Sequence, residues 1–172
     1  MDKIKFELGF YYDKDYGSGF PIIDISINER KLLDIVTEVE RKNAQRMGFD
    51  FGGGYTGVRA TPYVVEGDHF LGLSIPGSAK SHTRVLNCTC GNPRCWDVLA
   101  LIEADDKFVC WSYIINPWLL NGLPTHWHTE SPEDFVAFNY SSIGPYIFDR
   151  RQYEDALNEL RRSFKKGIFA QR

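Results

Sequence analysis

The chain has 172 residues, of which 43% are hydrophobic, so it is long enough to form one globular domain with a substantial core. We therefore expect a single domain over residues 1–172. The formal net charge of -3 argues against general affinity for nucleic acids or anionic membranes, which usually bind clustered Lys and Arg. A partner attracted by charge is expected to be basic.

The chain carries no sign of export or membrane insertion. Residues 1–5 contain no hydrophobic signal segment, and no apolar run approaches the roughly 20 residues needed to cross a bilayer. We therefore expect a cytoplasmic protein. Its four cysteines are then expected to be reduced thiols or metal ligands, not a disulfide framework.

The N-terminal third predicts two strands and a helix. Apolar and polar residues alternate over residues 4–10 and again over 23–27, with a turn-rich stretch between them, which indicates a hairpin. Apolar residues then recur at helical spacing from Leu32 to Val39. Asn28 is expected to cap this helix, which should end near Asn43 or Gly48.

The middle of the chain predicts two further hairpins. After a flexible loop at Gly52–Gly54, the β-rich runs at 63–65 and 70–73 flank a turn signal. Residues 98–102 and 108–115 surround Asp105-Asp106 and should form a central hairpin, in which Cys110 lies opposite about Leu101.

The C-terminal third begins with a long connection over residues 116–134, which is rich in proline and has no clear period. A short strand is expected at 135–138. Asp149 and Gln152 resemble a capping box, and an amphipathic helix follows with one apolar face formed by Tyr153, Leu157, Leu160 and Phe164. These elements predict an α+β fold with a largely antiparallel sheet, one helix after the second strand and one at the C-terminus.

Three cysteines fall within eight residues, and they could bind zinc or simply shape a buried turn. A structural zinc site normally has four protein ligands, so Cys88, Cys90 and Cys95 would need a fourth, for which His82 is the nearest candidate. The usual paired knuckles of two-residue spacing are missing. Reduced, buried thiols without a cofactor are the first expectation, zinc is the alternative, and redox chemistry is the third reading.

The long connection also contains a candidate binding patch. Alternating histidines around a tryptophan could ligate metal, carry out acid–base chemistry, lie exposed or contact a partner. The nearby acidic residues could form a solvated rim or receive a basic ligand. The residues of this predicted patch are His126, Trp127, His128, Glu130, Glu133 and Asp134.

Several short motifs resemble a family of small, uncharacterised bacterial proteins. They are Val39-Glu40 at the end of the first helix, Cys90-Gly91, Cys95-Trp96, Trp111-Ser112-Tyr113, Gly144-Pro145 and Phe148–Glu154. The resemblance extends from about Ile23 to Leu160 and implies a bacterial cytosolic origin and one fold, but no chemistry. The long connection at 117–134 departs from the family pattern.

Small, acidic, aromatic-rich bacterial proteins without a catalytic signature include many toxin immunity proteins. We therefore expect a non-enzymatic inhibitor that binds a cognate toxin domain with a basic surface. The alternatives are a zinc-stabilised binding module built on the three clustered cysteines, and an enzyme whose site the sequence spacing does not reveal.

Overall fold

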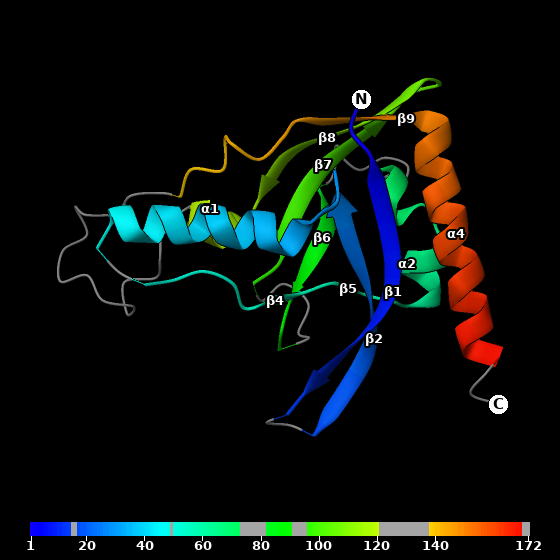
Figure 1. Cartoon of the computed structure of the whole chain (residues 1–172), viewed down its shortest axis with the longest axis horizontal. Coiled ribbons are helices and arrows are strands. Elements are labelled where there is room, and N and C mark those ends of the chain that lie inside the picture. Colours follow the sequence, from blue (N-terminus) through cyan, green and yellow to red (C-terminus); the bar gives the residue numbers. More distant parts are fainter. Residues whose placement is uncertain (15–16, 49, 73–81, 91–95, 121–137, 170–172) are drawn as a thin grey trace.

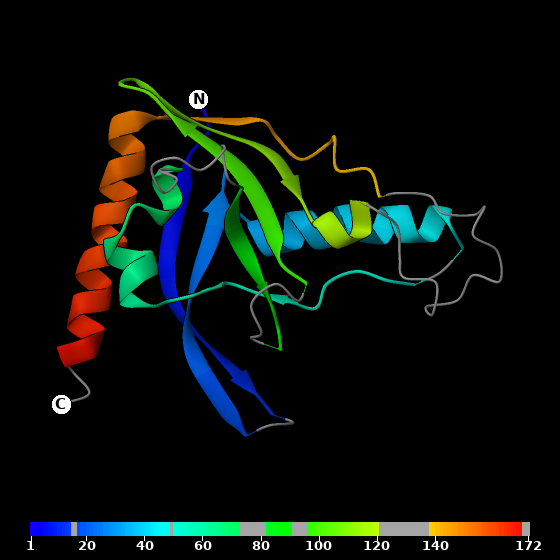
Figure 2. The same cartoon turned by 180° about the vertical axis from the view of Figure 1, so that it is seen from behind.

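The computed structural model describes residues 1–14, 17–48, 50–72, 82–90, 96–120 and 138–169. Over these residues the chain forms two antiparallel sheets with helices beside them (Figures 1 and 2). The predicted α+β class is confirmed.

The first sheet is built on the long hairpin of β1 (Ile4–Asp13) and β2 (Ser18–Ile27). The short strands β3 (Arg30–Lys31) and β5 (Val58–Arg59) also pair with β2. The alternation in the sequence sets the two faces of β1, because Ile4 and Phe6 are buried while the intervening charged residues are exposed. The first predicted hairpin is confirmed.

Asn28 does not cap a helix, contrary to the sequence prediction. Asn28 and Glu29 both have positive φ angles, 50° and 67°, and form the tight turn between β2 and β3. Two consecutive left-handed residues are what the type I′ two-residue hairpin turn requires. The Asn28 side chain instead accepts a hydrogen bond from the Lys3 backbone N–H and donates one to Asp2. Helix α1 (Leu32–Arg46) begins three residues after Glu29.

The second sheet has the order β4 (Tyr55–Thr56), β6 (Thr83–Cys88), β7 (Val98–Ala104), β8 (Phe108–Ile115) and β9 (Tyr146–Asp149). The β7–β8 hairpin confirms the central hairpin of the sequence analysis. Its register differs, because Cys110 pairs with Glu103 and not with Leu101. Three residues, 105–107, separate the two strands, and the pair nearest the turn is Ala104 opposite Val109.

A hairpin was expected from the runs at 63–65 and 70–73, and over the described residues, 63–72, this prediction is wrong. They contain helix α2 (Pro62–Glu66) and the 3-10 turn η1 (His69–Leu71). Thr61 caps α2 by accepting a hydrogen bond from Val64 N–H, and Pro62 occupies the first turn, where a missing N–H costs nothing. This start signal outweighs the β propensity of the valines.

Helix α4 (Arg150–Phe169) confirms the predicted C-terminal helix. Asp149 caps it by accepting a hydrogen bond from Gln152 N–H at 3.0 Å, and the four predicted apolar residues are buried. The helix lies along β1 and α2 (Figures 1 and 2), where Arg161 donates to the carbonyl oxygen of Val65.

In the connection after β8, α3 (Pro117–Leu120) precedes residues 121–137, which lie outside the described residues. Phe138, the described end of the strand expected at 135–138, is not in a strand.

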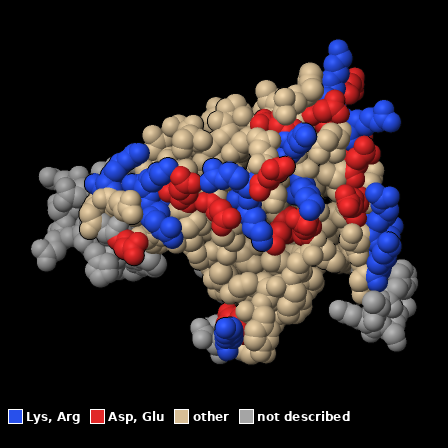
Figure 3. Space-filling view, viewed as in Figure 1, with Lys and Arg blue, Asp and Glu red and all other residues tan. Residues whose placement is uncertain are grey.

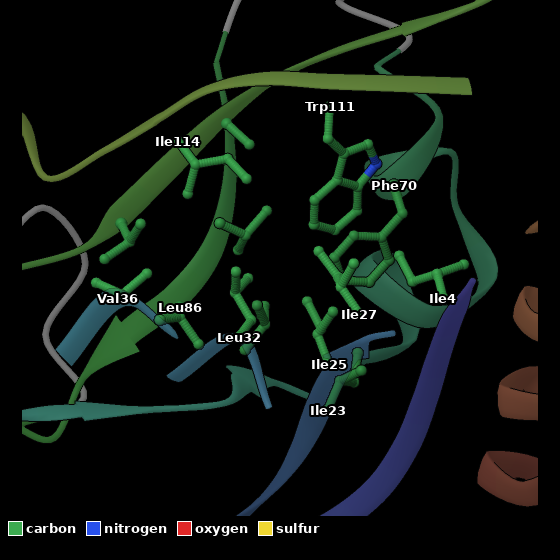
Figure 4. Close-up of a cluster of buried hydrophobic side chains, with 14 of the residues drawn as sticks. Ile4, Ile23, Ile25, Ile27, Leu32, Val36, Phe70, Leu86, Trp111 and Ile114 are labelled. Carbon is green, nitrogen blue, oxygen red and sulfur yellow. The ribbon is translucent and has the colours of Figure 1, made fainter. Parts of the chain in front are cut away.

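The core lies between the inner faces of the two sheets and the first turns of α1 (Figure 4). The isoleucines of β2 face Phe70 and the fully buried Trp111 of β8, and Leu32 and Val36 close one side of the cluster. The Trp111 indole N–H donates to the hydroxyl of Tyr153, so the largest core side chain has its polar atom satisfied.

Candidate partner-binding surface

The outer half of the β1–β2 hairpin extends away from the body of the molecule (Figure 1). We call its described residues, 9–14 and 17–21, the projecting hairpin. Two large aromatic side chains on it are exposed, Phe10 by 64% and Tyr12 by 56%. Because exposed aromatic surface is unfavourable in water, a cluster of this kind marks a surface that a partner can cover.

The exposure of Phe10 and Tyr12 follows from the alternation of apolar and polar side chains along β1. Phe10 and Tyr12 continue the every-second-residue series of Ile4, Phe6 and Leu8, so they lie on the same face of the strand as the core residues. Ile4 and Phe6 are buried and Leu8 is half-buried. The strand therefore carries its apolar face beyond the part of the fold that covers it.

Gly19 allows the Phe10 ring to lie close against the opposite strand. A Cβ atom at Gly19 would be 2.5 Å from the Phe10 Cε1 atom and 2.5 Å from the Tyr11 carbonyl oxygen, which is too close for any other residue without a shift. The ring is thus seated over glycine backbone. An aromatic group held in this way loses less conformational entropy when a partner binds.

The reverse face of the projecting hairpin is braced internally. The rings of Tyr11 and Phe20 lie on opposite strands with centroids 5.4 Å apart, and the Arg59 guanidinium lies 5.0 Å from the Phe20 centroid. Cross-strand aromatic pairs and cation–π contacts each contribute on the order of 0.5–1 kcal/mol at such sites. These contacts stiffen the hairpin that presents Phe10 and Tyr12.

Charged side chains are sparse on the projecting hairpin. Its described residues contain one acid and one base, Asp13 and Lys14 near the tip, whereas mixed charges cover α1 and α4 (Figure 3). A contact through the hairpin is therefore mainly apolar and aromatic.

The six residues of the predicted patch lie outside the described residues, so the structure does not test that prediction. The described segments on either side of 121–137 do come together. Phe138 N–H donates to the carbonyl oxygen of Leu119 at 3.2 Å. Asn139 N–H donates to Asn43 of α1 at 2.9 Å, and the Asn43 amide donates back to the Asn139 carbonyl. The described residues on the two sides of this connection therefore lie next to each other.

A buried carboxylate links this place to α1. Glu40 is fully buried, and its Oε1 atom accepts hydrogen bonds from the hydroxyls of Tyr55 at 2.5 Å and Tyr140 at 2.8 Å. The Asn116 side chain donates to the Tyr55 hydroxyl at 2.8 Å. Glu40, Tyr55, Asn116 and Tyr140 form what we call the Glu40 network, which fixes both flanks of the connection.

The glycine loop closes the Glu40 network on one side. Gly53 N–H donates to the second Glu40 oxygen at 3.4 Å, and Gly52–Gly54 all have positive φ angles. The loop runs against α1, because a Cβ atom at Gly52 would lie 3.1 Å from the Thr37 carbonyl oxygen. Glycine is required here by backbone conformation and close packing.

Burial raises the pKa of Glu40, although the hydrogen bonds from both tyrosines and Gly53 favour the ionised form. Burial and the nearby Glu40 charge also raise the pKa of Tyr55 and Tyr140, so both hydroxyls keep their protons. All four side chains of the Glu40 network are buried. The network is therefore internal, and its hydrogen bonds hold segments of this chain to one another.

The clustered cysteines are only partly described. Cys88 is buried at the end of β6, Cys90 is exposed in the following turn, and Cys95 lies outside the described residues. Asp97 stabilises the first residue of this segment by accepting a hydrogen bond from Cys88 N–H at 3.2 Å. Among the residues that the structure describes, no three His, Cys, Asp or Glu side chains are placed to hold a metal ion. Zinc binding by Cys88, Cys90 and Cys95 stays a prediction.

The sequence analysis missed the projecting hairpin and the Glu40 network, although each has a sequence signal. The alternation of β1 continues to Tyr12, two residues beyond the predicted strand end. Glu40 follows Leu32 and Val36 at spacings of four residues, which places an acid on the apolar stripe of the helix. An acid at such a position needs hydrogen-bond donors when it is buried.

Comparisons of the chain with family models, curated proteins and solved structures found no match. Among the described residues, no helix has the length and apolar character to cross a membrane.

Proposed function

We propose that this chain is a non-enzymatic bacterial immunity protein, which binds a cognate toxin domain and neutralises it by covering its active surface. The observation that carries the proposal is the exposure of Phe10 and Tyr12 on a hairpin that projects from the molecule. Aromatic side chains supply a large share of the binding energy at protein interfaces, particularly where they are held in place before binding.

The proposed interface has two parts with different physical roles. The projecting hairpin supplies apolar area, which slows dissociation. The acidic residues of the predicted patch, Glu130, Glu133 and Asp134, supply attraction to a basic toxin and so speed association. The two parts are separable by kinetics, because only the charged part should weaken as salt is added.

The proposal is tested by co-expressing the chain with the toxin-like product of a neighbouring reading frame. The double variant Phe10→Ser/Tyr12→Ser should lose protection, and its affinity for the isolated toxin domain should fall by about 2 kcal/mol or more. Because both side chains are exposed, thermal unfolding should change little. Tyr63→Ser is the matched control, since Tyr63 is 77% exposed on α2.

Two results would contradict the proposal. The neighbouring product could be harmless alone or remain lethal beside the wild-type chain, which would remove the inhibitor function. Alternatively, the double variant could protect as well as the Tyr63→Ser control, which would remove the hairpin from the interface.

A further inference from the structure

An apolar groove of about 610 Å³ lies between the second half of β8 and residues 138–145. Buried side chains form its floor, among them Ile114, Phe138, Tyr140 and Ile143, and Tyr113 stands at its rim with 69% of its surface exposed. The groove is distinct from the projecting hairpin. β8 lies in the upper part of Figures 1 and 2, whereas the hairpin tip lies at the bottom of both.

One wall of the groove is a strand edge. Strand β9 pairs with Phe108–Trp111 of β8, and its ladder ends there. Ser112–Ile115 continue β8 beside β7, but among the described strands none borders them on the other side. A strand edge presents backbone donors and acceptors that an added strand can pair with.

A β-bulge aims Tyr113 outward at this edge. Leu101 pairs with Ser112 and Leu99 pairs with Ile115, so Tyr113 and Ile114 together oppose Ala100. Tyr113 has a φ angle of 49°, in the left-handed region that a non-glycine residue rarely occupies. The bulge keeps Ile114 buried and leaves an exposed aromatic ring in a strained backbone. Strain of this kind concentrates at binding sites.

The chemistry of the lining selects against charged ligands. None of the described side chains that line the groove is charged, and its polar groups are hydroxyls and the amide of Asn139. A charged group placed there would lose hydration without gaining a counterion. An uncharged segment in extended conformation satisfies both the apolar floor and the backbone edge.

We propose that this groove binds an extended, uncharged, apolar peptide segment of a partner protein, which adds as a strand to Ser112–Ile115 of β8. Tyr113 covers one face of the bound segment. The Tyr140 hydroxyl bonds to Glu40, so the groove floor is held rigid by the Glu40 network. The inference goes beyond the toxin-binding proposal and does not depend on it.

The test is panning of a phage-displayed random heptapeptide library against the full chain, followed by titration of enriched peptides by fluorescence polarisation. Enriched sequences should be uncharged and apolar. Tyr113→Gly should reduce their affinity at least about tenfold. Its stability should not fall, since glycine tolerates the positive φ angle. A merely structural role for Tyr113 predicts lower stability instead. Tyr113→Phe should bind as the wild type does.

Backbone pairing is tested separately with the best peptide N-methylated at alternate residues. The series that removes the N–H groups facing β8 should lose binding, and the series methylated on the outer edge should not. Phe108→Ser is the control variant, because Phe108 is exposed on the same strand outside the groove. Four results would each overturn the proposal: no enrichment, enrichment of charged peptides, equal binding to Tyr113→Gly, or equal binding by both methylated series.

Discussion

At the residue scale, Glu40 is the least ordinary side chain of the fold. It is a fully buried carboxylate whose described hydrogen-bond partners are two tyrosine hydroxyls and one backbone N–H, with no basic side chain among them. Burying a carboxylate is costly, and the donors only partly offset this cost. The raised pKa of Glu40 reflects the part of this desolvation cost that the hydrogen bonds do not offset.

The raised pKa predicts how stability depends on pH. The folded state holds the Glu40 proton more tightly than the unfolded state, so the resulting stabilisation is complete below the ordinary pKa of 4.5. The stabilisation is lost as pH rises from there through the folded-state pKa. Glu40→Gln cannot ionise, so the free energy of unfolding of the wild type relative to this variant should fall with rising pH.

Urea unfolding at a series of pH values from 4 to 8 measures this difference. Other groups with shifted pKa values, such as Asp2 and His69, are common to both proteins and cancel in the comparison. Parallel stability profiles for wild type and Glu40→Gln would show that Glu40 titrates normally in the folded protein.

At the element scale, the turn between β2 and β3 contains removable strain. Glu29 has a φ angle of 67° at the second position of a two-residue turn, where glycine after asparagine is the most favourable sequence. Glu29→Gly should therefore raise the free energy of unfolding, by about 0.5–1 kcal/mol after the entropy cost of glycine.

Chemical denaturation of Glu29→Gly beside Lys5→Gly measures the effect. Lys5 is exposed in extended backbone of β1, so glycine there should lower stability. If both variants were less stable than the wild type, the Glu29 side chain would contribute more to the free energy of unfolding than the strain at its positive φ angle costs.

The elements that the sequence predicted are those with a strong local period. Alternation predicted β1 and β2, the β-rich runs around Asp105-Asp106 predicted β7 and β8, and the apolar stripe with its Asp149 cap predicted α4. Prediction failed where two local signals competed. Asn28 can cap a helix or form a left-handed turn, and the pairing of β3 with β2 selects the turn.

Tertiary packing explains what the sequence could not predict about the candidate sites. The Glu40 network joins residues as far apart as 40 and 140, and no local pattern indicates such a contact. The bulge at Tyr113 appears only once β7 and β8 are paired. The exposure of Phe10 depends on where the rest of the fold stops covering β1.

At the scale of the whole molecule, the fold separates a buried frame from two presented surfaces. The core between the sheets and the Glu40 network hold the frame, while the projecting hairpin and the β8 groove remain accessible. A molecule of this kind can engage one partner by its hairpin and an extended peptide elsewhere without rearranging its core.

Amide hydrogen exchange of the chain with and without the cognate toxin domain tests the central claim most directly. Within the part of the chain that the structure describes, the projecting hairpin has no second sheet packed on it to protect its amides, so in the free chain they should exchange faster than those of the core strands. Binding through Phe10 and Tyr12 should slow exchange across residues 9–21. A complex that forms while exchange over residues 9–21 stays unchanged would contradict the account.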